Sequence, residues 1–185
     1  MDKYVPTNLP TEDSHSAIVI GGSVTGLIAA RVLSEHFERV TILERDRLTE
    51  RPEFRLGVPQ SLHVHVLLNK GQEILEQLFP GLSAKLLKNG ALNTDIVADC
   101  RYLFADGWAP KFDSGITMIT CSRNLLENAL RQRLGKYHNL KFLEAHRAVG
   151  LSLSNDSKST IGVKVSHDNR ELKLFSLVVY SHVSA

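Results

Sequence analysis

Residues 17–26, AIVIGGSVTG, decide the fold predicted for this chain. An apolar run at 17–20 leads directly into a glycine-rich turn, and residues 27–37 then carry apolar side chains at helical spacing. Gly21 permits a sharp backbone turn, and Gly26 lets the following helix lie close to the strand. A strand, a tight glycine turn and a helix in this order predict the opening of a dinucleotide-binding βαβ unit, whose helix N-terminus faces a pyrophosphate.

The spacing around this turn supports nucleotide binding, with one substitution in the glycine pattern. Ser23 stands at the second glycine position of G-x-G-x-x-G, where it narrows the approach to a phosphate but adds a hydroxyl donor. A second predicted strand at 39–43 ends in Glu44, close to the roughly 20-residue spacing of a ribose-binding carboxylate. The alternative is a purely structural glycine turn followed by a solvated Glu44-Arg45-Asp46 strand end.

Composition indicates a soluble globular chain of ordinary make-up. The 185 residues are 43% hydrophobic and 23% charged, with a net charge of +2, and the basic residues are scattered, so no nucleic acid partner is expected. Two cysteines, Cys100 and Cys121, suggest a reducing compartment, and we expect a cytoplasmic protein. No apolar run approaches the roughly 18–20 residues of a membrane span. Residues 1–16 lack a signal core and are expected to form a flexible arm.

The rest of the chain alternates helical and extended patterns. We expect a loop at 46–62, helices at 69–79 and 83–88, and short strands and turns at 91–119 with a hairpin turn at Asp106-Gly107. Ser122 is the predicted N-cap of a helix that ends near 134, and a strand follows at 140–144. Residues 149–174 predict a three-stranded antiparallel meander with one buried face, and residues 177–179 a buried parallel strand.

Two further features carry polar side chains of interest. His63 and His65 would face the same side of a strand, which permits a metal pair, but no cysteine or carboxylate cluster accompanies them. We therefore expect the wall of a ligand pocket and predict no metal site. Arg123 lies in the first turn of a helix, where a cation opposes the dipole, which indicates an anionic partner unless the side chain points to solvent.

Taken in order, the motifs resemble a known family. They are GGSVTG, the strand ending in Glu44, R-x-G-V-P-Q-x-x-H-x-H-x-L-L at 55–68, L-E-x-L-F-P-G-L at 75–82, and S-R-x-L-L-E-x-x-L-R-x-R at 122–133. Residues 17–179 resemble the N-terminal half of FAD-dependent monooxygenases of the para-hydroxybenzoate hydroxylase superfamily. The branch that they resemble most is that of bacterial flavin epoxidases and squalene-monooxygenase-like proteins.

The resemblance implies an α/β fold, a Rossmann-like FAD-binding domain with a parallel sheet core and an antiparallel meander. Residues 17–179 would form this domain, and 180–185 would be a tail foreign to the family. The acidic and glycine residues that follow the last strand in the family are missing, as is the C-terminal substrate domain. The resemblance therefore predicts a truncated enzyme, a fragment whose own activity is not expected.

The resemblance also assigns site residues and a chemistry. It implies that the glycine turn holds the FAD pyrophosphate, that Glu44 accepts from the ribose, that the 55–60 loop lies along the flavin side and that Arg123 meets the pyrophosphate or ribitol. The cofactor-binding set is Gly21, Gly22, Ser23, Thr25, Gly26, Glu44, Arg45, Arg55, Gln60 and Arg123. Because the oxygen chemistry belongs to the flavin, no catalytic side chain is predicted. NAD(P)H is the expected electron donor, and the organic substrate is not specified.

Two other functions fit part of the pattern. An NAD(P)-dependent dehydrogenase would use Gly21, Gly26 and Glu44 equally well, although a simple Rossmann chain would return to its sheet sooner than residue 140. A non-catalytic FAD-binding subunit would need a separately encoded C-terminal half as its partner.

Overall fold

The computed structural model describes residues 15–55, 57–168, 170–175 and 177–180. The expectations for residues 1–14 and 181–185 lie outside this part of the chain, but Ser16 already belongs to the first strand and Tyr180 to the last. The chain divides into two compact units. One comprises the chain up to Thr49 together with the chain from Leu134 onward, and the other is Glu50–Arg133. Within the described residues, no helix has the length and apolar character needed to cross a membrane.

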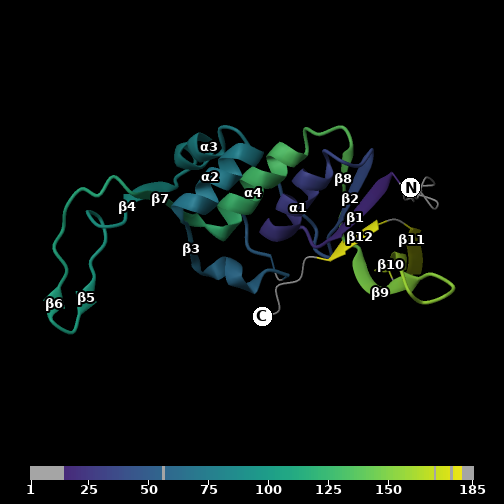
Figure 1. Ribbon diagram of the computed structural model, residues 1–185. Helices are drawn as coiled ribbons and strands as arrows, with labels where there is room; N and C mark the ends of the chain where they lie inside the picture. Colours follow the sequence, from purple (N-terminus) through teal and green to yellow (C-terminus); the bar gives the residue numbers. More distant parts are fainter. Residues whose placement is uncertain (1–14, 56, 169, 176, 181–185) are drawn as a thin grey trace. The chain divides into compact units, whose positions relative to one another are not determined.

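A four-stranded parallel sheet organises the first unit. Its strands β1 (Ser16–Ile20), β2 (Arg39–Leu43), β8 (Leu140–Leu143) and β12 (Leu177–Tyr180) stand in the order β12-β1-β2-β8 (Figure 1). Helix α1 (Val24–Leu33) packs against β1 and β2. The predicted strand–turn–helix–strand order and the parallel sheet are confirmed, although the helix ends before residue 37. The burial of the β12 side chains lies outside the described residues.

An antiparallel meander completes this unit. Strands β9 (Arg147–Leu153), β10 (Thr160–His167) and β11 (Arg170–Phe175) pair in the order β11-β10-β9, as predicted. Side chains from the central and outer strands pack with the parallel sheet in one core, which includes Ile18, Leu43, Val163, Val165 and Leu174.

The expectation of one buried face is wrong for β9. The side chains of Val149, Leu151 and Leu153 are about half exposed, whereas Ser152 is buried. Strand β9 lies at the edge of the meander, and its register with β10 shifts between Thr160 and Gly162 and again between Lys164 and Val165. Such irregularities re-aim side chains, so the alternating apolar pattern of an edge strand does not fix which face is covered.

The second unit has a smaller antiparallel sheet with helices on it. Strands β3 (Val64–Leu67), β7 (Thr117–Ser122) and β4 (Leu92–Asp95) stand in the order β3-β7-β4. Helices α2 (Asn69–Leu78) and α3 (Leu82–Lys88) contact β7, and Ile119 and Cys121 are buried. Helix α4 (Arg123–Leu134) follows β7, and a 3₁₀ helix η1 (Pro59–Leu62) interrupts the predicted 46–62 loop.

The predicted N-cap of α4 is confirmed. The Oγ atom of Ser122 accepts a hydrogen bond from the backbone N–H of Leu125 at 3.2 Å, which satisfies one of the donors left without a partner at a helix start. This cap fixes the first turn of α4 and therefore the place of Arg123, its first residue.

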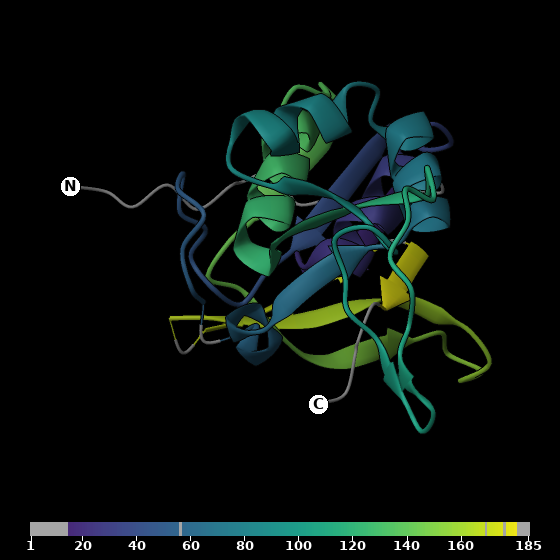
Figure 2. The same cartoon turned by 90° about the vertical axis from the view of Figure 1, so that its left-hand side faces the viewer.

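A hairpin on two long connections extends from the β4–β7 pair, as Figure 1 and Figure 2 both show. It consists of β5 (Leu103–Phe104) and β6 (Gly107–Trp108), which confirms the predicted turn at Asp106-Gly107. Its large apolar side chains are exposed, Trp108 among them.

Asp95 joins the two ends of this excursion. Its carboxylate accepts hydrogen bonds from the backbone N–H groups of Val97 and Ala98 on one side and of Ser114 and Gly115 on the other. The Ser114 hydroxyl donates a further bond. The Ala98 N–H, together with the other donors, holds the pKa of Asp95 well below its usual range, against the opposing effect of burial.

These hydrogen bonds to the Asp95 carboxylate predict that the free energy of unfolding depends on pH. Because the folded pKa of Asp95 is lowered, its charge stabilises the fold above the unfolded pKa of about 3.9, and that stabilisation is lost as the pH falls through the lower folded pKa. Urea unfolding of Asp95→Asn should therefore show a deficit against wild type that is constant from about pH 5 to 8 and shrinks below about pH 4. Asp106→Asn, at an exposed turn residue, is the matched control. A deficit that persists unchanged at low pH would contradict the role given to the carboxylate.

Candidate functional site

The turn between β1 and α1 is built from backbone geometry that only glycine adopts readily. Gly21 has φ of 104°, in the left-handed range, and its N–H donates to the carbonyl oxygen of Leu43 at 2.8 Å. This bond ties the turn to the end of the neighbouring strand β2. Ser23 occupies the N-cap position of α1 in an extended conformation, and its carbonyl accepts from the N–H of Leu27 at 2.9 Å. The first helical N–H groups therefore lie at the end of the parallel strands.

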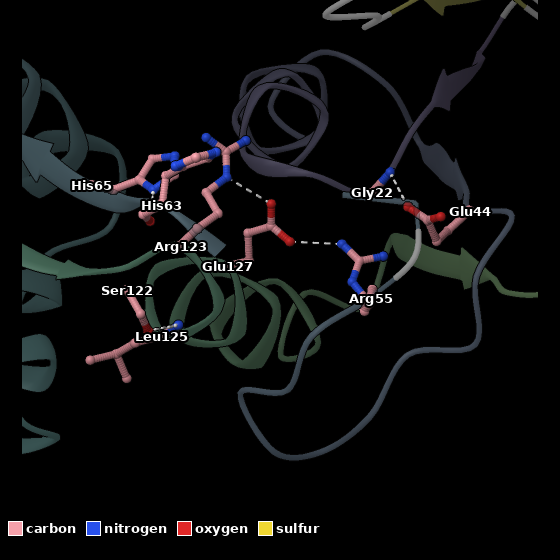
Figure 3. Close-up of polar contacts among 9 residues, drawn as sticks. All are labelled: Gly22, Glu44, Arg55, His63, His65, Ser122, Arg123, Leu125 and Glu127. Atoms are coloured by element: carbon pink, nitrogen blue, oxygen red, sulfur yellow. Dashed lines mark hydrogen bonds and ion pairs between the residues drawn. The ribbon is translucent and has the colours of Figure 1, made fainter. Parts of the chain in front are cut away.

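Gly22 and Glu44 meet at this turn, as Figure 3 shows. The Gly22 N–H donates to Oε2 of Glu44 at 2.8 Å, and the Asp46 N–H donates to Oε1 at 2.9 Å. The Glu44 residue is only 5% exposed. A Cβ atom on Gly22 would lie 3.0 Å from Oε2 of Glu44, so the carboxylate occupies the space that a side chain would need.

The arrangement places the start of helix α1 and the carboxylate of Glu44 together at the ends of β1 and β2. The start of α1 carries a partial positive charge and has no acidic residue in its first turn, which favours an anion such as a phosphate. A carboxylate has lone pairs for about four hydrogen bonds, so the two backbone bonds to Glu44 do not by themselves exhaust its capacity to accept from hydroxyl groups. A phosphate and a pair of sugar hydroxyls are the groups that such a site fits.

The other predicted residues of this unit lie around the same turn. Thr25 is exposed in the first turn of α1, and Gly26 is buried on the helix side that faces the sheet strands. Arg45 is exposed directly after Glu44. The first unit thus brings the glycine turn, Glu44 and Arg45 together in the way that the strand order requires.

Two arginines predicted to bind the cofactor share one carboxylate in the second unit. Nη2 of Arg55 lies 2.7 Å from Oε2 of Glu127, and Nε of Arg123 lies 2.9 Å from Oε1 (Figure 3). The side chains of Arg55 and Glu127 are 4% and 2% exposed, and that of Arg123 is 19% exposed. The cluster is therefore a buried ion-pair network with two cations and one anion among these three side chains.

Glu127 is the member that sequence reasoning missed. It lies four residues after Arg123 on α4, a spacing that places two side chains on the same helix face, and this signal was present in the sequence. Its carboxylate supplies Arg123 with an anionic partner from its own helix. The unfavourable position of Arg123 at the helix start therefore does not by itself require a bound ligand.

The two histidines lie at the start of β3. His63 is exposed and directly precedes the strand, whereas His65 lies within it, so they are not two positions of the same strand. Nδ1 of His65 lies 2.8 Å from the carbonyl oxygen of His63. Gln60 is half-buried in η1. Across the residues that the structure describes, no group of three or more His, Cys, Asp or Glu side chains is placed to hold a metal ion.

Comparison with known sequences gives one informative relative. No protein-family model matches the chain. The chain is similar to Protein Rv3254 of Mycobacterium tuberculosis, with 38% identity over 131 residues, and the match covers 69% of this chain and 28% of the relative. The chain thus spans little more than a quarter of that protein.

Comparison with solved structures identifies the fold. The chain resembles p-nitrophenol 4-monooxygenase PnpA from Pseudomonas putida, with a TM-score of 0.68 and 18% identity over 92% of this chain and 41% of that one. It also resembles PqsL, a probable FAD-dependent monooxygenase from Pseudomonas aeruginosa, with a TM-score of 0.64 and 15% identity over 90% and 42% of the two chains. Because these identities are low, the likeness establishes a shared mixed α/β fold over most of this chain.

Proposed function

We propose that the chain is the FAD-binding part of an oxidoreductase of the flavin monooxygenase type, with a Rossmann-like arrangement around its parallel sheet. The observation that carries the proposal is the pairing of Gly22 with Glu44 at the end of β1 and β2, beside the start of α1. Among the solved structures of similar fold, PqsL is described as a probable FAD-dependent monooxygenase, which supports a flavin in preference to other dinucleotides. We also propose, from the sequence motifs, that the chain belongs to the branch of flavin epoxidases and squalene-monooxygenase-like proteins.

The residues of the first unit have distinct roles in this proposal. The turn of Gly21, Gly22 and Ser23, with Thr25 and Gly26 at the start of α1, binds the pyrophosphate through backbone N–H groups. Glu44 accepts hydrogen bonds from the adenosine ribose, and Arg45 flanks it. Bound FAD supplies the redox chemistry, and NAD(P)H is the proposed reductant of the flavin. The protein's contribution here is binding and orientation.

The assignment of the second-unit residues Arg55, Gln60 and Arg123 to the cofactor is likewise a proposal that rests on the sequence resemblance. Because the chain spans 28% of its relative and 42% or less of PnpA and PqsL, oxygenation of a substrate is proposed only for a protein that also contains the corresponding further length.

Substitution of Glu44, the carboxylate proposed to bind the ribose, tests the FAD-binding proposal. Glu44→Gln keeps an oxygen acceptor for the Gly22 N–H but removes the charge, so FAD affinity should fall about tenfold while the fold is retained. Glu38→Gln, an exposed glutamate of the same unit, should leave the affinity unchanged. Affinity is measured by titration of flavin fluorescence, with NAD titrated in parallel by calorimetry. Binding of NAD without FAD would contradict the flavoprotein assignment and favour a dehydrogenase.

A further inference from the structure

We propose that His146 and His167 are positioning residues, which hold the turn after β8 in the conformation that keeps Glu44 in place for the ribose of the cofactor. The inference rests on the proposed function, because it takes Glu44 as the ribose-binding carboxylate. It adds a role for two histidines that act on the site through the backbone of this turn. All of these residues belong to the first unit.

The turn at 144–146 is hydrogen-bonded to the segment that carries Glu44. The His146 N–H donates to the carbonyl oxygen of Glu44 at 2.9 Å, and the Ala145 N–H donates to that of Asp46 at 3.2 Å. The Asp46 N–H in turn donates to Oε1 of Glu44 at 2.9 Å. The backbone of Glu44 and one hydrogen bond of its carboxylate therefore depend on where this turn lies.

Ala145 gives the turn a backbone conformation that needs support. Its φ is 56°, in the left-handed region that residues other than glycine rarely adopt. Such a conformation persists only where the surrounding structure fixes it. One support is the imidazole of His167, whose Nδ1 lies 2.9 Å from the carbonyl oxygen of Ala145. His167 is the last residue of β10, so this bond ties the turn to the meander.

A second imidazole stacks on the first and supports the same turn. Nδ1 of His146 lies 2.5 Å from the carbonyl oxygen of Glu144. The centroids of the His146 and His167 rings are 4.1 Å apart, and the rings are within 3° of parallel. Because a carbonyl oxygen can only accept, the Nδ1–H of each ring donates. The stacked pair therefore holds the two peptide groups on either side of the Ala145 Cα atom.

The consequence for the ribose follows from hydrogen-bond geometry. Hydrogen bonds weaken steeply as their angles depart from linear, so a carboxylate that accepts from sugar hydroxyls must be held closely. Loss of the bond to the Ala145 carbonyl would let the turn relax out of the left-handed region and move the backbone partners of Glu44 and Asp46. Binding of the ribose hydroxyls should weaken, whereas phosphate binding by the glycine turn should not.

A ratio of two affinities isolates this effect. ADP carries the adenosine ribose of FAD, and 2′,3′-dideoxy-ADP lacks only the two ribose hydroxyls. Wild type should bind ADP about tenfold more tightly than the dideoxy analogue, and His167→Ala should reduce this ratio to about twofold. A variant that is merely less folded binds both ligands more weakly by the same factor, so its ratio stays unchanged. Both affinities are measured by displacement of FAD, followed by flavin fluorescence.

Conservative variants identify the group responsible. The side-chain amide N–H of asparagine lies near the position of Nδ1, so His167→Asn should keep the wild-type ratio within about twofold. His167→Gln carries its amide farther along the side chain and should lose the ratio as His167→Ala does, and it replaces the alanine variant if thermal unfolding shows that variant to be unfolded. His146→Ala should also lower the ratio. His36→Ala, at an exposed histidine of the same unit, should not.

The outcomes separate this inference from the proposed function. A wild-type ratio in folded His167→Ala or His167→Gln, or an equal loss in His167→Asn, would overturn the positioning role alone. Glu44→Gln should lower the same ratio. If Glu44→Gln leaves the ratio unchanged, or if wild type binds neither FAD nor ADP, the ribose site of the proposed function fails and this inference fails with it.

Discussion

Glu127→Ala is expected to destabilise the folded chain by about 3–5 kcal/mol, because it leaves the guanidinium ions of Arg55 and Arg123 without the carboxylate that they share. The measurement is the free energy of unfolding in urea at neutral pH. Glu73→Ala removes a carboxylate from an exposed pair with Lys70 and should cost no more than about 1 kcal/mol. Equal losses in the two variants would mean that the buried network is not an energetic unit.

A compensated variant extends this prediction. Replacing all three side chains, as in Arg55→Met, Glu127→Leu and Arg123→Met together, removes the Glu127 carboxylate together with both guanidinium ions that it pairs with, and should recover most of the lost stability. The same variant should bind FAD at least tenfold more weakly than wild type, since both arginines that are proposed to bind the cofactor are gone. Recovery of stability without loss of affinity would confine the network to a structural role.

Gly22→Ala is the second change with a large expected effect. The added Cβ would lie 3.0 Å from Oε2 of Glu44, so the carboxylate must move and its hydrogen bond from the Gly22 N–H is disturbed. Overpacking and the weakened bond together predict a loss of about 2–4 kcal/mol in unfolding free energy. Urea unfolding measures it.

Gly150→Ala is the matched control for this glycine. Its Cβ would lie 3.6 Å from Cδ of Lys164, an ordinary contact with a flexible side chain, so its effect should stay within about 1 kcal/mol. A Gly22→Ala variant as stable as Gly150→Ala would show that the turn does not depend on the close approach of Glu44.

The parallel core was predictable because local and long-range signals agree there. The run before Gly21, the helical spacing after it and the β-branched strand ending at Leu43 each specify one element, and their order leaves a parallel pairing as the natural outcome. The turn geometry followed from the same residues, since Gly21 does adopt a positive φ. The hydrogen bond between Gly22 and Glu44 was predictable only in part. The sequence spacing indicates that a carboxylate lies near the turn, but it does not indicate which backbone N–H donates to it.

Features that depend on tertiary contacts were harder to predict from the sequence. The apolar alternation of β9 indicated a covered face, but bulges and an edge position leave Leu151 half exposed. Nothing in the local sequence distinguishes Asp95 from other polar residues at strand ends. Its carboxylate accepts hydrogen bonds from Ser114 and Gly115, about 20 residues away, so these bonds could not be predicted from the sequence around it. The bond from Arg55 to Glu127 joins residues 72 positions apart, so only the Arg123 half of that network had a sequence signature.

The most direct test of the FAD-binding assignment is the visible absorption spectrum of the purified chain after incubation with FAD and removal of unbound cofactor. Wild type and Gly150→Ala should retain flavin bands near one equivalent, and Gly22→Ala should lose them. A colourless wild-type chain that is folded, or equal retention by wild type and Gly22→Ala, would contradict the claim that this glycine turn and Glu44 form the cofactor site.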